Sequence, residues 1–262
     1  MTMARFLLVH GAMGGAWVWE RVSAGLQAAG HETRAIDLPG QGADATPLAE
    51  ITLYRYADAV CDALGDIPGR PLLVGHSMGG MVITQAAGGR PGVAERLAGL
   101  VYVTAFLPQP GQSLHELTQL PEAAGDSVQA NIVVAGDPPV ATMPPEAAPE
   151  ALSHCASEEQ LAWAMPQRGS QPVIPFTQPF TPGANTAAFD ALPRAYVTCL
   201  QDRAIKPALQ RRMFTAAGCD PVIEIDTDHS PWLTRTDELV AALDRIAGGL
   251  QWRRGRRLAP AR

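Results

Sequence analysis

The sequence predicts a doubly wound α/β fold with a mostly parallel sheet of about six strands. Continuous apolar runs of four to seven residues are typical of strands that are buried on both faces. Amphipathic segments separate the early runs, and alternation of strand and helix predicts a parallel sheet covered by helices. The six predicted strands are Arg5–Val9, Thr33–Ile36, Pro71–Val74, Leu97–Val103, Ala195–Leu200 and Val222–Ile225.

Helices are expected between these strands. In the segment Gly15–Ala29, for example, Trp19, Val22 and Leu26 recur at helical spacing, so one face would be apolar. The other segments with a helical pattern or position are Leu53–Ile67, Met78–Gly88, Pro207–Ala217 and Asp237–Leu250.

The alternation breaks between residues 108 and 193, where Pro, Ala, Gln and Ser dominate. A plain loop of that length is uncommon inside a compact domain. We therefore predict an inserted, mainly helical cap, with Ala151–Met165 as its best helix. The core would comprise residues 1–107 and 194–252, and residues 253–262 would form a flexible basic tail.

Composition excludes several classes of protein. Hydrophobic residues make up 47% of the 262 residues and the net charge is −6, which argues against disorder and against a nucleic-acid partner. No apolar stretch reaches the roughly 20 residues that a membrane span needs, and no signal peptide is recognisable, so we expect no membrane contact and a cytoplasmic location. The four cysteines form no CxxC pair, so no metal is expected. A homodimer stays open.

A nucleophile motif follows the third predicted strand. Residues Gly75–Gly79 read GHSMG and match G-x-S-x-G, with an apolar strand before and a helix-compatible run after. A sharp strand-to-helix turn lifts the Ser77 side chain clear of the backbone, and the small residues Gly75 and Gly79 let the chain pass close to itself. The motif in this context predicts Ser77 as the nucleophile of an α/β-hydrolase.

A serine hydroxyl needs a general base and an acid that orients it. In this fold the chain order is Ser, acid, His, and of six histidines only His229 falls late enough, just beyond the last strand. Asp202 follows the strand Ala195–Leu200 at the edge where strands end, which favours it as the acid. Asp226 and Asp228 are rivals that lie close to His229 in the chain.

Two backbone amides are expected to form an oxyanion hole. One belongs to Met78, the residue after the nucleophile, and the other to Ala12 in the glycine-rich loop after the first strand. This loop contains neither G-x-x-x-x-G-K-[ST] nor G-x-G-x-x-G, so nucleotide binding is a weak interpretation and no cofactor is expected.

Four segments resemble one family. The stretches LLVHGAMGGAWVWERVSAGLQAAGHETRAIDLPG, LVGHSMGG, TCLQDRAIKP and DTDHSPWLTRTDEL resemble the plant methylesterase and hydroxynitrile lyase family and its bacterial carboxylesterase relatives, which include pyrethroid hydrolases. The resemblance covers residues 4–107 and 194–248 and is weak in the cap. It implies Ser77, Asp202 and His229 as a catalytic triad, with the Ala12 and Met78 amides as oxyanion donors.

The resemblance also separates reactions within the family. Its cyanohydrin-cleaving lyases carry a Lys directly after the catalytic His and a Thr directly after the His that ends the first strand. Here those positions hold Ser230 and Gly11, which favours ester hydrolysis. Thioester or lactone hydrolysis uses the same triad and stays open, and so does a non-catalytic binding module.

The expected substrate is a small to medium apolar or aromatic ester. Apolar side chains are frequent in the cap and in the motif loops, and no cluster of Arg or Lys in the cap marks a strongly anionic substrate. As substrate contacts we predict Trp17, Trp163, Met165 and Trp232, and the cap also offers Met143, Phe176 and Phe180.

Overall fold

A six-stranded parallel sheet forms the centre of the molecule. The computed structural model describes residues 3–184 and 186–257, with side chains up to residue 249. Every neighbouring pair of strands in this sheet is parallel, which confirms the predicted fold class. The strand order is β2 (Glu32–Ile36), β1 (Arg5–Val9), β3 (Leu72–Ser77), β4 (Gly99–Ala105), β8 (Arg194–Cys199) and β9 (Val222–Ile225).

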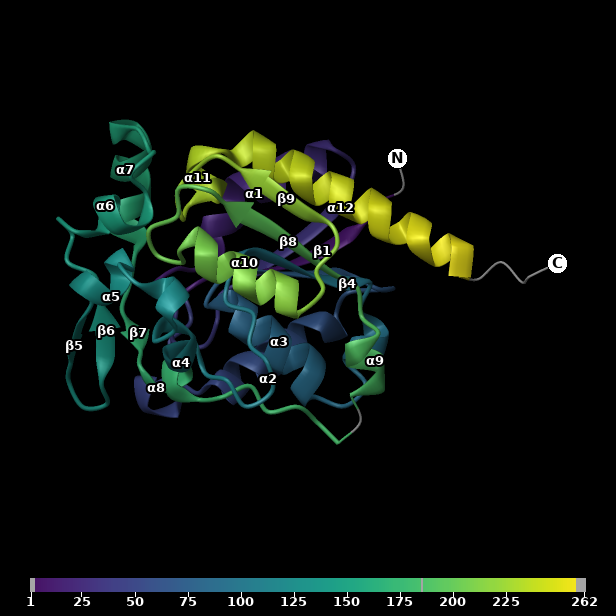
Figure 1. Cartoon of the computed structure of the whole chain (residues 1–262), viewed down its shortest axis with the longest axis horizontal. Coiled ribbons are helices and arrows are strands. Elements are labelled where there is room, and N and C mark those ends of the chain that lie inside the picture. The colour runs from purple at the N-terminus through teal and green to yellow at the C-terminus, as the bar shows by residue number, and fades with distance from the viewer. Residues whose placement is uncertain (1–2, 185, 258–262) are drawn as a thin grey trace.

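Helices cover both faces of the sheet (Figure 1). One face packs against α1 (Glu20–Ala28), α11 (Pro231–Thr234) and α12 (Thr236–Arg257). The other face packs against α2 (Leu53–Gly65), α3 (Gly79–Gly89) and α10 (Pro207–Ala216). The four inner strands β1, β3, β4 and β8 are therefore buried on both faces, which explains why their sequences are largely apolar without alternation, whereas the edge strands β2 and β9 are partly exposed.

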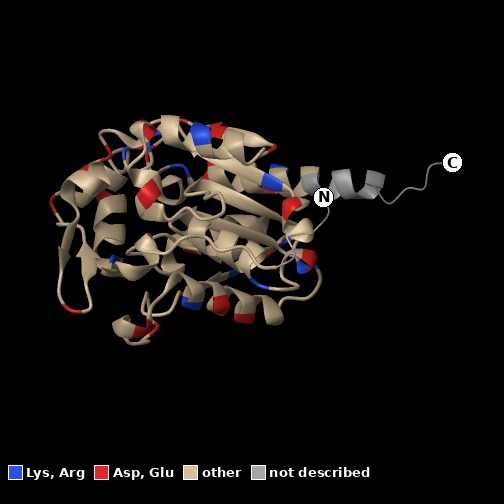
Figure 2. Ribbon diagram, turned by 60° about the horizontal axis from the view of Figure 1, so that its bottom comes forward, with Lys and Arg blue, Asp and Glu red and all other residues tan. Residues whose placement is uncertain are grey.

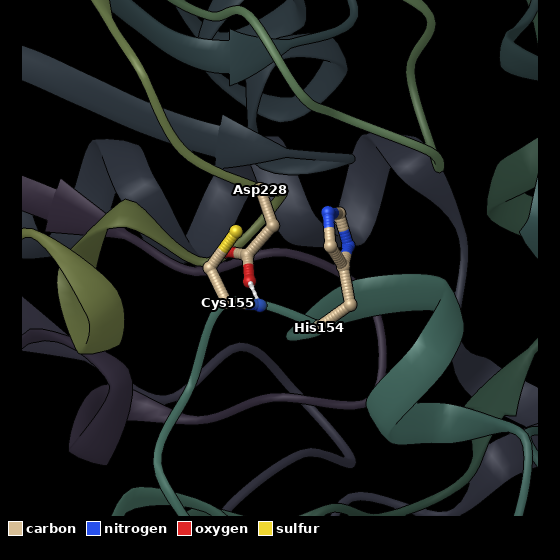
Figure 3. Close-up of side chains that lie close together, drawn as sticks. All are labelled: His154, Cys155 and Asp228. Carbon is tan, nitrogen blue, oxygen red and sulfur yellow. Dashed lines mark hydrogen bonds between the residues drawn. The ribbon is translucent and has the colours of Figure 1, made fainter.

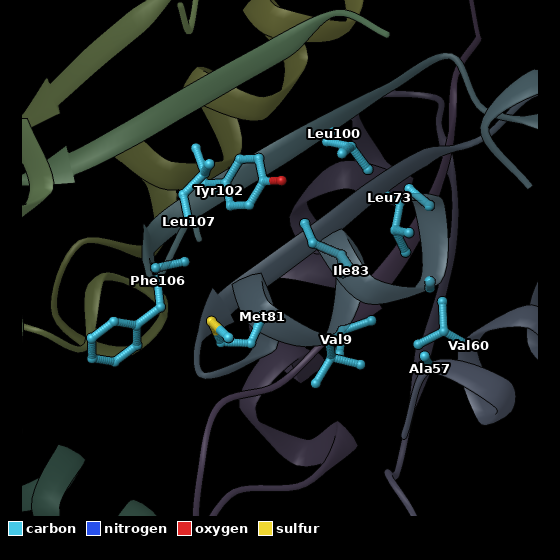
Figure 4. Packing of buried hydrophobic residues seen from close by; sticks show 14 of the residues in the cluster. Val9, Ala57, Val60, Leu73, Met81, Ile83, Leu100, Tyr102, Phe106 and Leu107 are labelled. Atoms are coloured by element: carbon cyan, nitrogen blue, oxygen red, sulfur yellow. The ribbon is translucent and has the colours of Figure 1, made fainter. Parts of the chain in front are cut away.

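The two cores are made by successive residues of the same strands. In β3, Leu73 belongs to the core under α2 and α3, whereas Leu72 and Val74 belong to the core under α1 and α12. Figure 4 shows the first of these cores, where Leu73 and Val9 of the sheet face Val60 of α2. Burial of these side chains on both faces is the main favourable contribution to folding.

Most of the segment between β4 and β8 lies at one end of the sheet, whereas its last helix, α9 (Ala187–Asp190), lies toward the other end, near the turn that precedes β4 (Figure 1). Its helices are short: α4 (Leu114–Thr118), α5 (Ser127–Asn131), α6 (Ala148–Leu152), α7 (Glu158–Ala164), α8 (Ile174–Thr177) and α9. It also contains a small antiparallel sheet of β5 (Val133–Ala135), β6 (Val140–Thr142) and β7 (Gln171–Pro172), which the sequence did not predict because its strands have only two or three residues.

The predicted helix Ala151–Met165 is wrong as a single element. Helix α6 ends at Leu152, and α7 begins at Glu158 after a capping box in which the Ser157 side chain accepts a hydrogen bond from the Gln160 amide. The intervening backbone is held by contacts with the core, since the Cys155 amide donates to Asp228 over 2.7 Å. Tertiary hydrogen bonds here outweigh helix propensity.

The C-terminal segment also differs from expectation. Helix α12 continues to Arg257, so residues 253–257 of the predicted flexible tail are helical, and residues 258–262 lie outside the described part of the chain. Over the part of the ribbon that Figure 2 colours, basic and acidic positions are interspersed. Of the helices that the structure describes, none is both long and apolar enough to cross a bilayer.

The turn between β3 and α3 is packed too closely for side chains at its glycines. A Cβ atom at Gly75 would lie 2.6 Å from the carbonyl oxygen of Gly79, and one at Gly79 would lie 2.7 Å from that of His10. A Cβ at Gly80 would overlap the carbonyl oxygen of Phe106. The start of α3 can therefore approach β1 and β4 only because these positions are glycine.

This packing predicts the cost of an added methyl group. Gly80→Ala should lower the free energy of unfolding by roughly 1–3 kcal/mol, because backbone must move to admit the new atom. Gly65→Ala is the matched control: Gly65 lies at the end of α2 with nothing within 4 Å of the added Cβ, so stability should stay or rise by up to about 1 kcal/mol. Urea denaturation measures both values, and an equal effect at the two positions would contradict the argument.

Candidate active site

Ser77 occupies the strained turn at the end of β3. Its φ is 54°, in the left-handed region that residues other than glycine rarely adopt, at a cost of about 1–3 kcal/mol. The β3–β4 register also shifts between His76 and Ser77. A Cβ atom at Gly11 would lie 2.7 Å from the Ser77 Cβ, so the loop after β1 can pack this closely against the serine only because residue 11 is glycine. The turn thus presents the hydroxyl beside the glycine-rich loop.

The His229 ring joins Ser77 to Asp202. Its Nε2 accepts a hydrogen bond from the Ser77 hydroxyl over 2.9 Å, and its Nδ1 donates to Asp202 Oδ2 over 2.7 Å. Asp202 follows β8 and His229 follows β9, so three strand ends of the same sheet supply the three side chains. All three residues are buried, which shields their hydrogen bonds from water.

Asp202 is held by four further donors. Its Oδ1 accepts hydrogen bonds from the backbone amides of Ala204 and Ile205, at 2.7 and 2.8 Å. Its Oδ2 also accepts from the Thr104 hydroxyl and, at 3.3 Å, from Gln210 Nε2. Sequence reasoning missed Thr104 and Gln210, because nothing in their local pattern shows that β4 and α10 meet this carboxylate. These contacts fix the oxygen that faces the histidine.

The two rival aspartates have other partners. Asp226 accepts a hydrogen bond from Gln201 Nε2 at 2.9 Å. Asp228 accepts from the amides of Cys155 and Ser230, at 2.7 and 2.9 Å. Within the described residues, neither carboxylate contacts the His229 ring. The carboxylate that the structure places on His229 is therefore Asp202.

A second histidine supports the first. His76 Nε2 donates a hydrogen bond to the backbone carbonyl of His229 over 2.8 Å, and the two rings lie with their centroids 4.8 Å apart. Burial, followed by the nearby His229, holds the pKa of His76 well below its usual range. His76 is thus a neutral donor that positions the His229 backbone, a role that sequence reasoning did not assign.

His10 positions the glycine-rich loop. Its Nδ1 donates to the carbonyl of Gly11 over 2.7 Å, and its Nε2 accepts from the amide of Leu38 over 3.1 Å. Burial lowers the pKa of His10, which keeps the ring neutral so that it can both donate and accept. Ala12, which follows Gly11 in this loop, lines the cavity that contains Ser77, and so does Met78.

This cavity has a volume of about 670 Å³, including space open to solvent. Core and cap both contribute to it, and most of its lining is apolar. The apolar side chains are Met13, Phe106, Leu114, Val128, Ile132, Met143, Leu152, Phe176, Ala204 and Ile205. Two ionisable groups of the cap, Asp126 and Arg168, also line it.

The predicted substrate contacts Trp17, Trp163, Met165 and Trp232 are not among the residues that line this cavity. Trp232 is buried in the core under α1 and α12, and the other three pack against that core. Trp17 makes edge contacts with both Trp163 and Trp232, with ring centroids 5.7 and 5.4 Å apart. The assignment is corrected: these apolar side chains join cap to core. Of the other cap candidates, Met143 and Phe176 do line the cavity.

Near His229, the structure brings together His154, Cys155 and Asp228 (Figure 3). Each offers one atom of a kind that binds metals, and these atoms lie within 4.8 Å of one another. The carboxylate of Asp228 already accepts hydrogen bonds from the amides of Cys155 and Ser230, and the bond from Cys155 fastens the cap to the loop that carries His229.

The comparisons with known proteins agree with this fold. Residues 6–242 match the model of the alpha/beta hydrolase family, and the chain belongs to that family. It is 31% identical to Methylesterase 7 of Arabidopsis thaliana over 254 residues, covering 93% of this chain and 96% of the relative. It is 29% identical to an alpha-hydroxynitrile lyase of the same plant over 255 residues, covering 92% and 96%. The structure of a pyrethroid hydrolase from Sphingobium faniae JZ-2 superposes with a TM-score of 0.80 at 25% identity, covering 94% of this chain and 98% of that one.

Asp126 gives the cavity a group that titrates near neutrality. It caps α5, where its Oδ1 accepts hydrogen bonds from the amides of Val128 and Gln129 at 2.7 and 3.2 Å. Burial raises its pKa to about 6, against the lowering effect of these two hydrogen bonds. The Asp126 carboxyl therefore binds its proton more tightly in the folded protein than in the unfolded chain.

That difference predicts a pH dependence of stability. The contribution of Asp126 should be lost as pH rises from about 4 to about 6, because the unfolded chain releases the proton first. Asp126→Asn keeps a good helix cap but no longer titrates, so its stability relative to wild type should increase across this window. Urea denaturation between pH 4 and pH 7 measures the difference. Asp62→Asn, on the exposed side of α2, is the control, and parallel curves for both variants would refute the argument.

Proposed function

We propose that this protein is a serine carboxylesterase that hydrolyses a small to medium apolar or aromatic ester. The observation that carries the proposal is the hydrogen-bonded chain from Ser77 through His229 to Asp202, which opens on an apolar cavity. Among its relatives, the proteins named methylesterase and pyrethroid hydrolase support ester bonds as the target.

The proposed reaction has two halves. Ser77 Oγ attacks the ester carbonyl while its proton passes to His229 Nε2, and Asp202 stabilises the imidazolium that forms. The tetrahedral intermediate collapses as the alcohol leaves with the proton from His229. Water then attacks the acyl-enzyme, His229 takes one of its protons, and the acid departs while Ser77 regains its hydrogen.

The oxyanion of each intermediate would be stabilised by the backbone amides of Ala12 and Met78. Both residues line the cavity beside Ser77. Met78 stands at the N-terminus of α3, where the helix dipole favours negative charge. The hydrogen bond from His10 to Gly11 would hold the Ala12 loop in place before substrate arrives, and donors fixed in this way cost no reorganisation during the reaction.

The lyase alternative is disfavoured by two positions. The lysine that the resembling lyases carry after their catalytic histidine is Ser230 here, whose hydroxyl accepts from Ser153 at 2.9 Å and donates to the Leu152 carbonyl at 2.8 Å. The threonine of those lyases is Gly11 here, where a side chain would collide with Ser77. Ser230 thus fastens the cap, and no amine stands at that position to receive cyanide.

Replacing the nucleophile tests the proposal. Ser77→Ala should lower kcat/KM for p-nitrophenyl and methyl aryl esters by about 10⁴-fold or more, because no other group takes over covalent attack. The fold should persist, as judged by circular dichroism and melting temperature. Folded Ser77→Ala protein that retained wild-type activity would show that Ser77 is not the nucleophile.

The same preparation separates the alternatives. A fluorophosphonate probe should label wild type but not Ser77→Ala, and absence of labelling in wild type would favour a binding module. Thioesters and lactones assayed beside matched esters show whether the oxygen ester is preferred. Cyanide release from mandelonitrile should stay at background, and release that depends on Ser77 would favour the lyase.

A further inference from the structure

One arginine, Arg168, lines the mostly apolar cavity. Arg168 follows the short helical turn Met165–Gln167 of the cap and lies on the cavity with Ser77 and His229. Its backbone is fastened to the core on the side of the glycine-rich loop, since the amide of Gly169 donates to the carbonyl of Met13 over 3.1 Å. The next residue is held as well, because Gln41 Nε2 donates to the Ser170 carbonyl over 3.0 Å.

No carboxylate among the described residues makes a direct ion pair with the guanidinium of Arg168. Its Nε is buried and has no hydrogen-bond partner in the described part of the chain. Asp228 acts on it electrostatically, but the oxygens of that carboxylate accept from Cys155, Ser230 and Thr234. A buried donor without a partner costs about 1–3 kcal/mol and more when it is charged.

The electrostatic surroundings of Arg168 also favour an anionic partner in the cavity. Burial lowers the pKa of Arg168 to about 10, so the group remains a cation at neutral pH, and the residue as a whole is half-buried. Its charge also contributes to the low pKa of His76, whose ring lies beside that of His229. The cation therefore lies within electrostatic reach of the reaction centre.

We propose that Arg168 is a specificity-determining residue that binds a carboxylate on the substrate, so that the preferred ester has an apolar body with an anionic end. The planar guanidinium can donate two parallel hydrogen bonds to a carboxylate, which would satisfy the unpartnered Nε. This inference rests on the proposed esterase function and narrows its substrate class.

Asp126 restricts where the anionic end can lie. Its carboxyl lines the same cavity, and the charges of Asp202 and His229 act on its pKa. The charge that acts on the pKa of Arg168 is instead that of Asp228. A substrate carboxylate next to Asp126 would be repelled once Asp126 is ionised, so the anion belongs on the side of Arg168 and the glycine-rich loop. The sequence showed no cluster of basic residues in the cap, but one arginine is enough to bind one carboxylate.

Paired substrates test the inference. Monomethyl adipate is compared with its uncharged terminal amide, and 4-carboxyphenyl acetate with 4-carbamoylphenyl acetate, so that the anion lies on the acyl side in one pair and on the alcohol side in the other. Wild type should prefer the carboxylate in at least one pair. Arg168→Met should lower kcat/KM for that carboxylate roughly 10–100-fold and leave its amide within about twofold.

Controls separate charge from structure. Arg168→Lys should retain part of the preference, and Arg55→Met, on the exposed side of α2, should retain all of it. If Arg168→Met does not fold, a competition experiment with wild type takes its place. Benzoate should inhibit ester hydrolysis of 4-carbamoylphenyl acetate about tenfold more strongly than benzamide does.

The outcomes distinguish the two proposals. Equal rates on carboxylate and amide, or an equal loss on both in Arg168→Met, would overturn the anion subsite while the esterase stands. Failure of wild type on all four of these esters and also on the p-nitrophenyl and methyl aryl esters would overturn the esterase. Adipate binding to Ser77→Ala and to Ser77→Ala/Arg168→Met, measured by calorimetry, then tests the subsite alone, and equal affinities would overturn it.

Discussion

The hydrogen bonds of the His229 ring are the interaction on which the rest of the site depends. They connect Ser77, Asp202 and His229, which follow or end three different strands of one parallel sheet. Parallel strands place their carboxyl ends at a common edge, so His229 can meet both Asp202, 27 residues away in the sequence, and Ser77, 152 residues away. The glycines around the β3–α3 turn and the buried neutral His76 both serve this geometry, the first by admitting the turn and the second by holding the His229 backbone.

The cap is joined to the same histidine loop. Ser153 donates to Ser230, and the Cys155 amide donates to Asp228, so residues on both sides of His229 hold the cap segment between α6 and α7. The interruption of the helix at this point is therefore a consequence of docking, since a continuous helix would bond its amides internally. Through these contacts, the cap that lines the cavity is attached to the loop that carries the proposed base, His229.

The cavity combines an apolar lining with two groups that burial disfavours when they are charged, Asp126 and Arg168. A protein that needed only to exclude water could line such a space with hydrocarbon side chains. An arginine Nε left without a partner, on the same cavity as the proposed nucleophile, is more informative, because its cost is offset when a ligand supplies the missing acceptor. The cavity thus points to substrates with both apolar and anionic parts.

The sequence by itself determined the sheet, because buried parallel strands require continuous apolar runs, and it singled out Ser77, Asp202 and His229, because the motif and the ends of strands fall at readable positions. It wrongly assigned Trp17, Trp163, Met165 and Trp232 to the cavity, because the sequence pattern of an apolar side chain is the same whether that side chain faces a core or a cavity. Thr104, Gln210, His76 and Arg168 gave no local signal. Only the tertiary structure decided their roles, because the partner of a hydrogen bond, or its lack, depends on segments that are distant in the chain.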